Sequence, residues 1–152
     1  MAKFYGTYPS TLDSKGRFLL PVGIKKQLPE SENSFMLSSG FDECINLYTM
    51  EQWNNKIDEL SQLDDNEPKV RDYRRKLMGS SSLAELDSAG RLLISSLLRD
   101  YGKLSKDIII MSAFDKFEIM DVAKYNKLFE GLSSDEFSKL AAEANSFKKK
   151  KD

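Results

Sequence analysis

The feature that most constrains how this chain of 152 residues can fold is a short motif that occurs twice. The segment LDSKGRFLLP at residues 12–21 is matched by LDSAGRLLIS at residues 86–95. A second match follows in the same order, between GFDECINLY at residues 40–48 and AFDKFEIMD at residues 113–121. Repeated matches in one order indicate a duplicated unit, and an internal repeat has to be recognised before any fold is assigned.

Each copy of the motif predicts a strand, a tight turn and a second strand. Asp13 and Gly16 stand at the first and fourth positions of the first turn, and Asp87 and Gly90 hold the same positions in the second. This is type I turn chemistry, because the Asp side chain can accept hydrogen bonds from N–H groups of the turn and Gly tolerates a positive φ. These four residues are therefore expected to shape and orient the turns.

Helices and further strands are expected after each turn. A short helix is predicted over residues 22–28 and again over residues 96–102, each followed by a second strand pair. The strands are short and rich in β-branched residues, which is typical of a small β-barrel or sandwich. A longer helix over residues 49–63 closes the first unit, since Thr49 and Gln52 have capping-box spacing.

The rest of the chain divides by composition. Residues 64–69, DDNEPK, predict an exposed acidic linker, and a basic helix ending at Gly79 follows. A last helix is expected from Ser133, which has capping-box spacing to Glu136. The expected organisation is a first unit with its closing helix (5–60), the acidic linker and basic helix (61–79), a second unit (80–130), and a C-terminal helix with a lysine-rich tail (131–152).

Composition argues against an enzyme. Histidine is absent, which removes the usual general base at neutral pH and the commonest metal ligand. No GxSxG elbow, phosphate-binding loop or CxxC pair occurs, and Asp64-Asp65 lies in the linker. We therefore expect no catalytic residue, no metal, no cofactor and no small-molecule substrate. The chain has neither a signal-peptide core at its start nor an apolar run of roughly 20 residues, so we expect a cytoplasmic protein without a membrane partner.

The formal net charge of −1 hides an uneven distribution of charge. Basic side chains are in excess over residues 1–28, acidic ones over residues 29–68, and basic ones again over residues 69–78. Separate basic and acidic surfaces are expected, and the basic ones could meet an anionic partner even though the whole chain is nearly neutral.

The charged residues of the first turn have two interpretations. In the structural one, Arg17 pairs with Asp13 as a partly exposed brace of the turn. In the functional one, the turn presents Lys15 and Arg17 to nucleic acid, because Arg can contact guanine or phosphate bidentately and Lys can contact phosphate. Duplication favours the second interpretation, since two related turns can address one groove of DNA from a single rigid face.

The sequence resembles the MraZ family of bacterial transcriptional regulators over nearly its whole length. The resemblance rests on TLDSKGRFLLP and ELDSAGRLLIS, each an Asp-x-x-x-Arg motif, with GFDECINLY and Trp53 between them. It implies an α+β fold with a mainly β core, in which two SpoVT-AbrB-type units form a pseudo-dimeric swapped-hairpin β-barrel with flanking helices. It also implies ring-like homo-oligomers that associate with the nucleoid.

The resemblance further implies binding to short direct repeats of double-stranded DNA in the promoter of the division and cell-wall gene cluster, with repression as the usual result. By matching position, Asp13 and Arg17 take the first motif and Asp87 and Arg91 the second, with Lys15 as a DNA contact. Ala89 stands where the first copy has Lys15, so the two turns are expected to contribute unequally. The alternative function is a ring-forming scaffold that binds proteins, not DNA, through the acidic segment 58–67.

Several other residues have simpler structural interpretations. The basic patch at residues 71–76 is expected to pair with the acidic segment before it, with a phosphate or subunit contact as the alternative. The tail at 148–151 is expected to be a solubilising end, and Cys44 a buried thiol. Aromatic residues are expected in the core and in interfaces, namely Phe35, Phe41, Tyr48, Trp53, Phe114 and Phe117.

Overall fold

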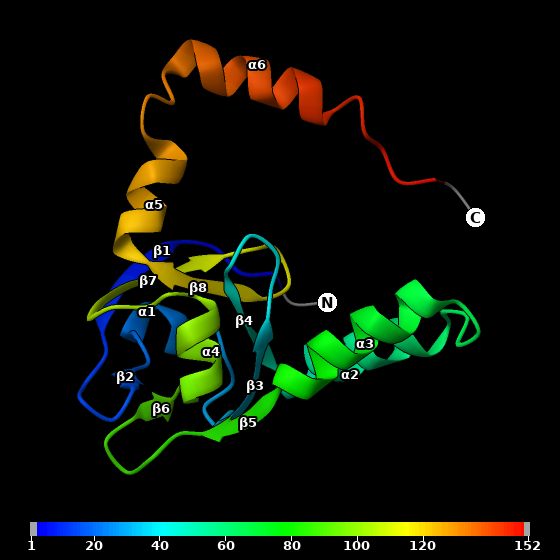
Figure 1. Cartoon of the computed structure of the whole chain (residues 1–152). Coiled ribbons are helices and arrows are strands. Elements are labelled where there is room, and N and C mark those ends of the chain that lie inside the picture. Colours follow the sequence, from blue (N-terminus) through cyan, green and yellow to red (C-terminus); the bar gives the residue numbers. More distant parts are fainter. Residues whose placement is uncertain (1–2, 151–152) are drawn as a thin grey trace. The chain divides into compact units, whose positions relative to one another are not determined.

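Antiparallel β-strands form the core of the protein (Figure 1). The computed structural model describes residues 3–150, so residues 151–152, at the end of the expected lysine tail, lie outside the described part. Within residues 3–150 the fold is α+β, as predicted. The strands are β1 (Thr7–Thr11), β2 (Arg17–Leu19), β3 (Ser34–Ser39), β4 (Ile45–Thr49), β5 (Ser82–Glu85), β6 (Arg91–Leu93), β7 (Asp107–Ser112) and β8 (Phe117–Asp121).

One large sheet exchanges strands between the two halves of the chain. Its order is β1-β7-β8-β4-β3-β5. The first strand of each half pairs with the third strand of the other half, β1 with β7 and β5 with β3. In the middle, β4 of the first half pairs with β8 of the second. The sheet is therefore a joint product of both copies, and neither copy holds the partner of its own first strand.

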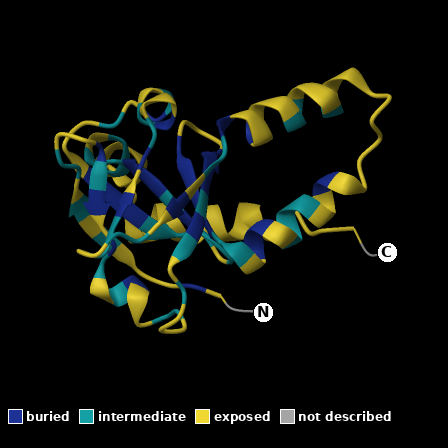
Figure 2. Cartoon of the chain, turned by 90° about the horizontal axis from the view of Figure 1, so that it is seen from below, coloured by how far each residue is buried: buried dark blue, intermediate teal, exposed yellow. Residues whose placement is uncertain are grey.

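The other two strands, β2 and β6, pair with each other as a short antiparallel ribbon. Phe18 lies opposite Leu92 at its centre, and both side chains are buried against the sheet. Because successive side chains of a strand point to opposite faces, this burial turns the residues on either side of them outward. Figure 2 shows the buried residues concentrated on the strands. The core residues come from both halves: Phe35, Leu37, Ile45, Leu47, Ile94, Leu98, Ile108, Ile110 and Ile119.

Helices follow the strands where the sequence predicts them. Short helices α1 (Val22–Lys25) and α4 (Ser96–Tyr101) come after the ribbon strands, and α2 (Met50–Ser61) begins at the predicted cap. Thr49 accepts a hydrogen bond of 3.2 Å from the backbone N–H of Gln52, which confirms that cap. Within residues 3–150, the helices are all too short or too polar to cross a membrane.

Helix α2 and helix α3 (Pro68–Ser80) pack together over a second apolar cluster. The cluster consists of Tyr48, Trp53, Leu60 and Leu77. Arg74 on α3 forms an ion pair with Asp65 of the acidic linker and donates a hydrogen bond of 3.0 Å to the carbonyl oxygen of Leu63. This ion pair agrees with the expected pairing of the basic patch with the acidic segment.

The chain after Val122 forms a second compact unit. It contains α6 (Ser134–Ala144) and, apart from Val122, the helix α5 (Val122–Phe129). Ser133 caps α6 by accepting a hydrogen bond of 3.2 Å from the N–H of Glu136, as its spacing predicts. Phe137 and Leu140 of α6 are exposed.

Two expectations differ from the structure. Strand pairing within residues 3–150 does not close into a barrel, because β2 and β6 are three residues long and pair with each other without joining β1 to β5. Phe41 and Phe114, expected in the core or an interface, are exposed at the corners that connect strands, at 75% and 65% of their surface. Phe114 has a φ of 74°. The left-handed corner takes it out of the strand, where alternation would have turned it toward the core.

Ser80 offers a test of how α3 is joined to the sheet. Its buried hydroxyl donates a hydrogen bond of 3.1 Å to the carbonyl oxygen of Leu77 and accepts one of 3.0 Å from the backbone N–H of Ser39. Ser80→Ala leaves that buried N–H without its partner, so we expect a loss of about 1–3 kcal/mol in the free energy of unfolding.

Urea unfolding of the two single variants Ser80→Ala and Ser81→Ala measures this. Ser81 is the matched control, since its hydroxyl donates only to the exposed Met78 carbonyl, and its loss should stay within about 0.5 kcal/mol. Equal effects of the two substitutions would contradict the role given to Ser80.

Candidate nucleic-acid interface

The first turn is held by one carboxylate. Asp13 Oδ1 accepts hydrogen bonds of 2.9 Å from the backbone N–H groups of Lys15 and Arg17, and Oδ2 accepts one of 2.8 Å from Nε of Arg17. Gly16, which has a φ of 86°, closes the turn with a hydrogen bond of 3.0 Å from its backbone N–H to the carbonyl oxygen of Asp13. The turn geometry predicted from the sequence is confirmed, and the structural brace between Asp13 and Arg17 is present.

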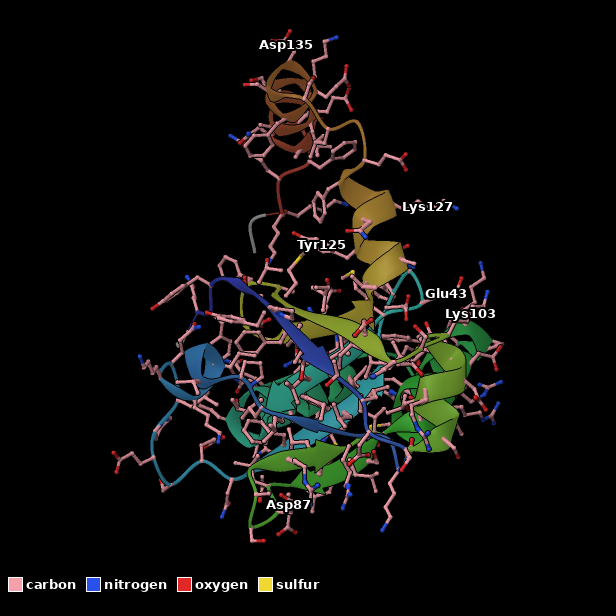
Figure 3. The ribbon with its side chains drawn as sticks, turned by 90° about the vertical axis from the view of Figure 1, so that its left-hand side faces the viewer. Glu43, Asp87, Lys103, Tyr125, Lys127 and Asp135 are labelled. Atoms are coloured by element: carbon pink, nitrogen blue, oxygen red, sulfur yellow. The ribbon has the colours of Figure 1, made fainter. Side chains whose placement is uncertain are left out.

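The second turn repeats this arrangement bond for bond. Asp87 Oδ1 accepts hydrogen bonds of 2.9 Å from the backbone N–H groups of Ala89 and Arg91, and Oδ2 accepts one of 2.9 Å from Nε of Arg91. Gly90 has a φ of 80°, and its backbone N–H donates a hydrogen bond of 2.9 Å to the carbonyl oxygen of Asp87. Figure 3 shows Asp87 on the turn between β5 and β6.

Both carboxylates are stabilised in their charged form. The backbone N–H of Arg17, followed by its guanidinium and the N–H of Lys15, lowers the pKa of Asp13 from 3.8 to about 2. The backbone N–H and side chain of Arg91 lower the pKa of Asp87 in the same way. Hydrogen bonds to a carboxylate favour its ionised state, so both aspartates stay charged and keep hold of their arginines at neutral pH.

The ribbon locks the two turns together. The backbone N–H of Leu20 donates a hydrogen bond of 3.0 Å to the carbonyl oxygen of Gly90 in the second turn. The backbone N–H of Ile94 donates one of 2.9 Å to the carbonyl oxygen of Gly16 in the first turn. Arg91 Nη1 also lies 3.8 Å from Asp13 Oδ2, which links the two charged clusters directly. In Figure 1 the two turns lie near each other at the lower left. Both predicted arginines therefore belong to one rigid surface.

The end of the Arg17 side chain remains available for a ligand. Arg17 uses Nε for Asp13, and within the described residues its Nη1 and Nη2 take part in no hydrogen bond or ion pair. The Arg17 and Arg91 side chains are 29% and 34% exposed. A guanidinium fixed through Nε and open at its terminal nitrogens can form two parallel hydrogen bonds to a phosphate or to the O6 and N7 atoms of guanine.

Two further cations, which were not among the predicted site residues, lie at the turns. A Cβ atom on Gly16 would lie 2.6 Å from Nε of Arg99, and one on Gly90 would lie 2.8 Å from Nζ of Lys25. Arg99 also donates 3.1 Å to the carbonyl of Ile94. The sequence did contain a signal for these two residues: Lys25 and Arg99 are separated along the chain by the same offset as the two motif arginines, Arg17 and Arg91. Their positions depend on the exchange between halves, because each lies at the turn of the other half.

A groove of about 970 Å³ runs beside the first turn. Apolar and basic side chains line it together, among them Pro9, Leu19, Val22, Ile109, Lys25 and Lys106. It lies along β1, at one edge of the large sheet. In residues 3–150, no three His, Cys, Asp or Glu side chains come together in a way that could hold a metal ion. The chemistry gathered around the turns is that of hydrogen-bond donors and positive charge.

Asp13 gives the protein a pH-dependent stability whose sign follows from its pKa. Because the folded value of about 2 lies below the ordinary 3.8, the charged carboxylate stabilises the folded state fully above about pH 4, and this contribution is lost as the pH falls toward about 2. We expect the free energy of unfolding of the wild type to fall more steeply in that window than the free energy of unfolding of Asp13→Asn.

Urea unfolding at a series of pH values measures both slopes. Asp87→Asn should change the slope in the same direction, since its carboxylate has the same partners. Identical slopes for the wild type and both variants would contradict the stabilising role of the two carboxylates.

Comparison with known proteins agrees with this architecture. The family model described as "MraZ protein, putative antitoxin-like" matches residues 3–76 and again residues 77–148. The chain is 36% identical over 145 residues to the Transcriptional regulator MraZ of Christiangramia forsetii, covering 94% of this chain and 93% of that protein. It is 33% identical over 141 residues to the protein of the same name from Nitratidesulfovibrio vulgaris, covering 92% of each chain. With two consecutive matches that span nearly all of its length, the chain belongs to the MraZ family.

Proposed function

We propose that this protein is a sequence-specific DNA-binding transcriptional regulator that recognises double-stranded DNA through its two turns. The observation that carries the proposal is the pair of arginines that aspartates hold through Nε on the outer face of one ribbon. Relatives that match over more than 90% of this chain carry the name Transcriptional regulator MraZ. A two-stranded ribbon fits the major groove of B-DNA, where base edges can be distinguished.

Each residue of the site has a distinct role in this proposal. Arg17 and Arg91 contact guanine edges or phosphates, and Lys15 contacts phosphate. Asp13 and Asp87 orient the arginines through their Nε atoms. Gly16 and Gly90 allow the turns to close. Lys25 and Arg99 add positive charge beside the turns, so the local field attracts DNA although the chain as a whole carries a net charge of −1.

The proposed biological role follows the family resemblance. The regulator would bind short direct repeats in the promoter of the division and cell-wall gene cluster and repress it. It would act in the cytoplasm, associated with the nucleoid, without an enzymatic activity or a cofactor. Short repeats suit a protein whose single reading surface is small, because linked copies on adjacent repeats bind with an avidity well above the affinity of one copy.

The two halves are proposed to be tandem SpoVT-AbrB-type units, with residues 5–60 and 80–130 as the repeated parts, 61–79 as a connecting segment and 131–152 as a C-terminal addition. In this arrangement the first hairpins are exchanged between the units. The pairing of β1 with β7 and of β5 with β3 supports this view, because a swapped hairpin leaves its own unit and completes the sheet of the other.

We also propose that the protein assembles into a ring-like homo-oligomer. The large sheet ends in two different edges, β1 and β5, and an open edge favours contact with another chain. Contact between two different surfaces of identical chains produces a ring when the rotation closes. Such a ring would place several copies of one basic ribbon near one DNA molecule.

A scaffold that binds proteins instead of DNA is the second candidate, and the mixed apolar and basic groove beside β1 favours it. The acidic segment 58–67, which is the predicted docking surface of such a scaffold, is partly occupied by the ion pair of Asp65 with Arg74. DNA binding separates the two candidates, because both are compatible with a ring.

Arg17→Ala tests the regulator directly. Removing the guanidinium should weaken binding to duplexes selected from random DNA by about 1–3 kcal/mol and relax the preference at one base position. Fold is preserved, because the side chain is partly exposed and lies on the outer face of the ribbon. Fluorescence anisotropy with the selected duplex measures the affinity.

Arg75→Ala is the matched control, since Arg75 is 73% exposed on α3 and pairs only with Asp72 of the same helix among the described residues. It should bind the selected duplex like the wild type. If the wild type retains no DNA even at low salt, the regulator is refuted and the scaffold is favoured.

Lys15→Ala tests the inequality of the two turns. Losing one phosphate contact should reduce the slope of log affinity against log salt concentration by about one. Ala89→Lys creates the missing cation in the second turn and should raise the slope by a similar amount, strengthening non-specific binding more than specific binding. Anisotropy titrations at several salt concentrations measure these slopes, and an unchanged slope in Ala89→Lys would mean that the second turn does not face DNA.

A further inference from the structure

The outer face of the β2–β6 ribbon carries four side chains in a square. Arg17 lies opposite Leu93, and Leu19 lies opposite Arg91. Each strand thus contributes one arginine and one leucine to this face, and the two arginines occupy diagonal corners. The other face of the same ribbon is closed by Phe18 and Leu92, which are 1% and 0% exposed.

The two leucines are strongly exposed although they lie at the centre of a basic site. Leu19 is 56% and Leu93 52% exposed. Alternation along the strand excludes them from the core, since Phe18 and Leu92 already occupy the inward positions. Two large apolar side chains between two arginines are therefore part of the surface that the arginines present to a ligand.

The duplication shows that the apolar character of this position is repeated. Some exposed positions near the turns differ between the copies, since Lys15 corresponds to Ala89 and Val22 to Ser96, whereas Ser14 and Ser88 are the same. The leucine two residues after each motif arginine, Leu19 or Leu93, is likewise the same in both copies. Strand formation alone does not require leucine here, because β-branched and polar residues are also accepted on the open face of a ribbon.

We propose that Leu19 and Leu93 are specificity-determining residues that recognise the 5-methyl groups of thymines in the major groove; this rests on the DNA-binding function proposed above. The thymine methyl is the one apolar feature of the major-groove edges, and apolar side chains contact it there. Residues two apart on a strand are about 6.8 Å apart, close to two base-pair steps of about 3.4 Å each. An arginine and its neighbouring leucine can thus read a guanine and a thymine two steps apart.

The test removes the methyl group and leaves the rest of the DNA unchanged. Duplexes enriched from random DNA by the wild-type protein are synthesised with each thymine replaced in turn by deoxyuridine. At a thymine read by one leucine, the affinity should fall about fourfold, which corresponds to about 0.8 kcal/mol for one buried carbon group. Thymines outside the ribbon contact should show no change.

Variants assign the effect to the leucines. Leu19→Ala and Leu93→Ala should each weaken binding to the thymine duplex and lose the deoxyuridine effect at one position, while the salt slope stays unchanged because no phosphate contact is lost. Leu19→Gln keeps the side-chain length if the shorter residue destabilises the ribbon, and should lose the same effect. Leu63→Ala is the matched control, because Leu63 is 39% exposed and lies after α2, outside the ribbon and the sheet edges; it should bind both duplexes like the wild type.

The outcomes separate this inference from the function on which it rests. Binding that depends on Arg17 but shows no deoxyuridine effect, or enriched duplexes without thymine, would refute the role of the leucines alone. A deoxyuridine effect that persists in both leucine variants would do the same. If the wild type enriches no sequence and retains no DNA at low salt, the DNA-binding function fails and the leucine assignment with it.

Discussion

The pairing of β2 with β6 is the contact on which the rest of the site depends. Each of these strands is three residues long, too short to persist as an isolated hairpin in water. The paired strands are stabilised by the burial of Phe18 and Leu92 on their inner face. Each fully buried side chain of this kind contributes about 1.5–3 kcal/mol to the free energy of folding. Bonds from Leu20 and Ile94 to the opposite turns hold the ends. Because inward residues fix the register, they also fix which residues face outward, so the core determines the composition of the surface.

How much of this could be predicted from the sequence depends on the range of the interactions. The two turns and the helix caps at Thr49 and Ser133 were predictable, because the Asp, Gly and capping side chains act within a few residues. The positions of Lys25 and Arg99 beside the opposite turns were not, since they require the exchange of strands between halves. Phe41 lies outside the core, because the corner that holds it turns away from the core; its expected place in an interface stays a prediction.

The two turns are alike in their hydrogen bonds and unlike in their charge. Lys15 has no counterpart at Ala89, but the exchange brings Lys25 to Gly90 of the second turn and Arg99 to Gly16 of the first. Each turn thus receives one cation from the other half, and the first turn keeps an additional one. A duplicated unit can diverge in this way without losing its fold, because an exposed turn position tolerates Lys or Ala equally well, whereas Asp and Gly are required by the turn itself.

An aspartate beside each arginine would at first seem to oppose DNA binding, because its negative charge offsets the positive charge of that arginine. The geometry gives the opposite result for recognition. Nε is fixed by the carboxylate, so the guanidinium loses less conformational freedom when its terminal nitrogens meet a base. Attraction over distance then has to come from cations without such a partner, and Lys15 is exposed for that role. Orientation and attraction are thus divided between two kinds of side chain, and because a braced arginine depends on its distance and angle to the base, selectivity rests on the arginines more than on total charge.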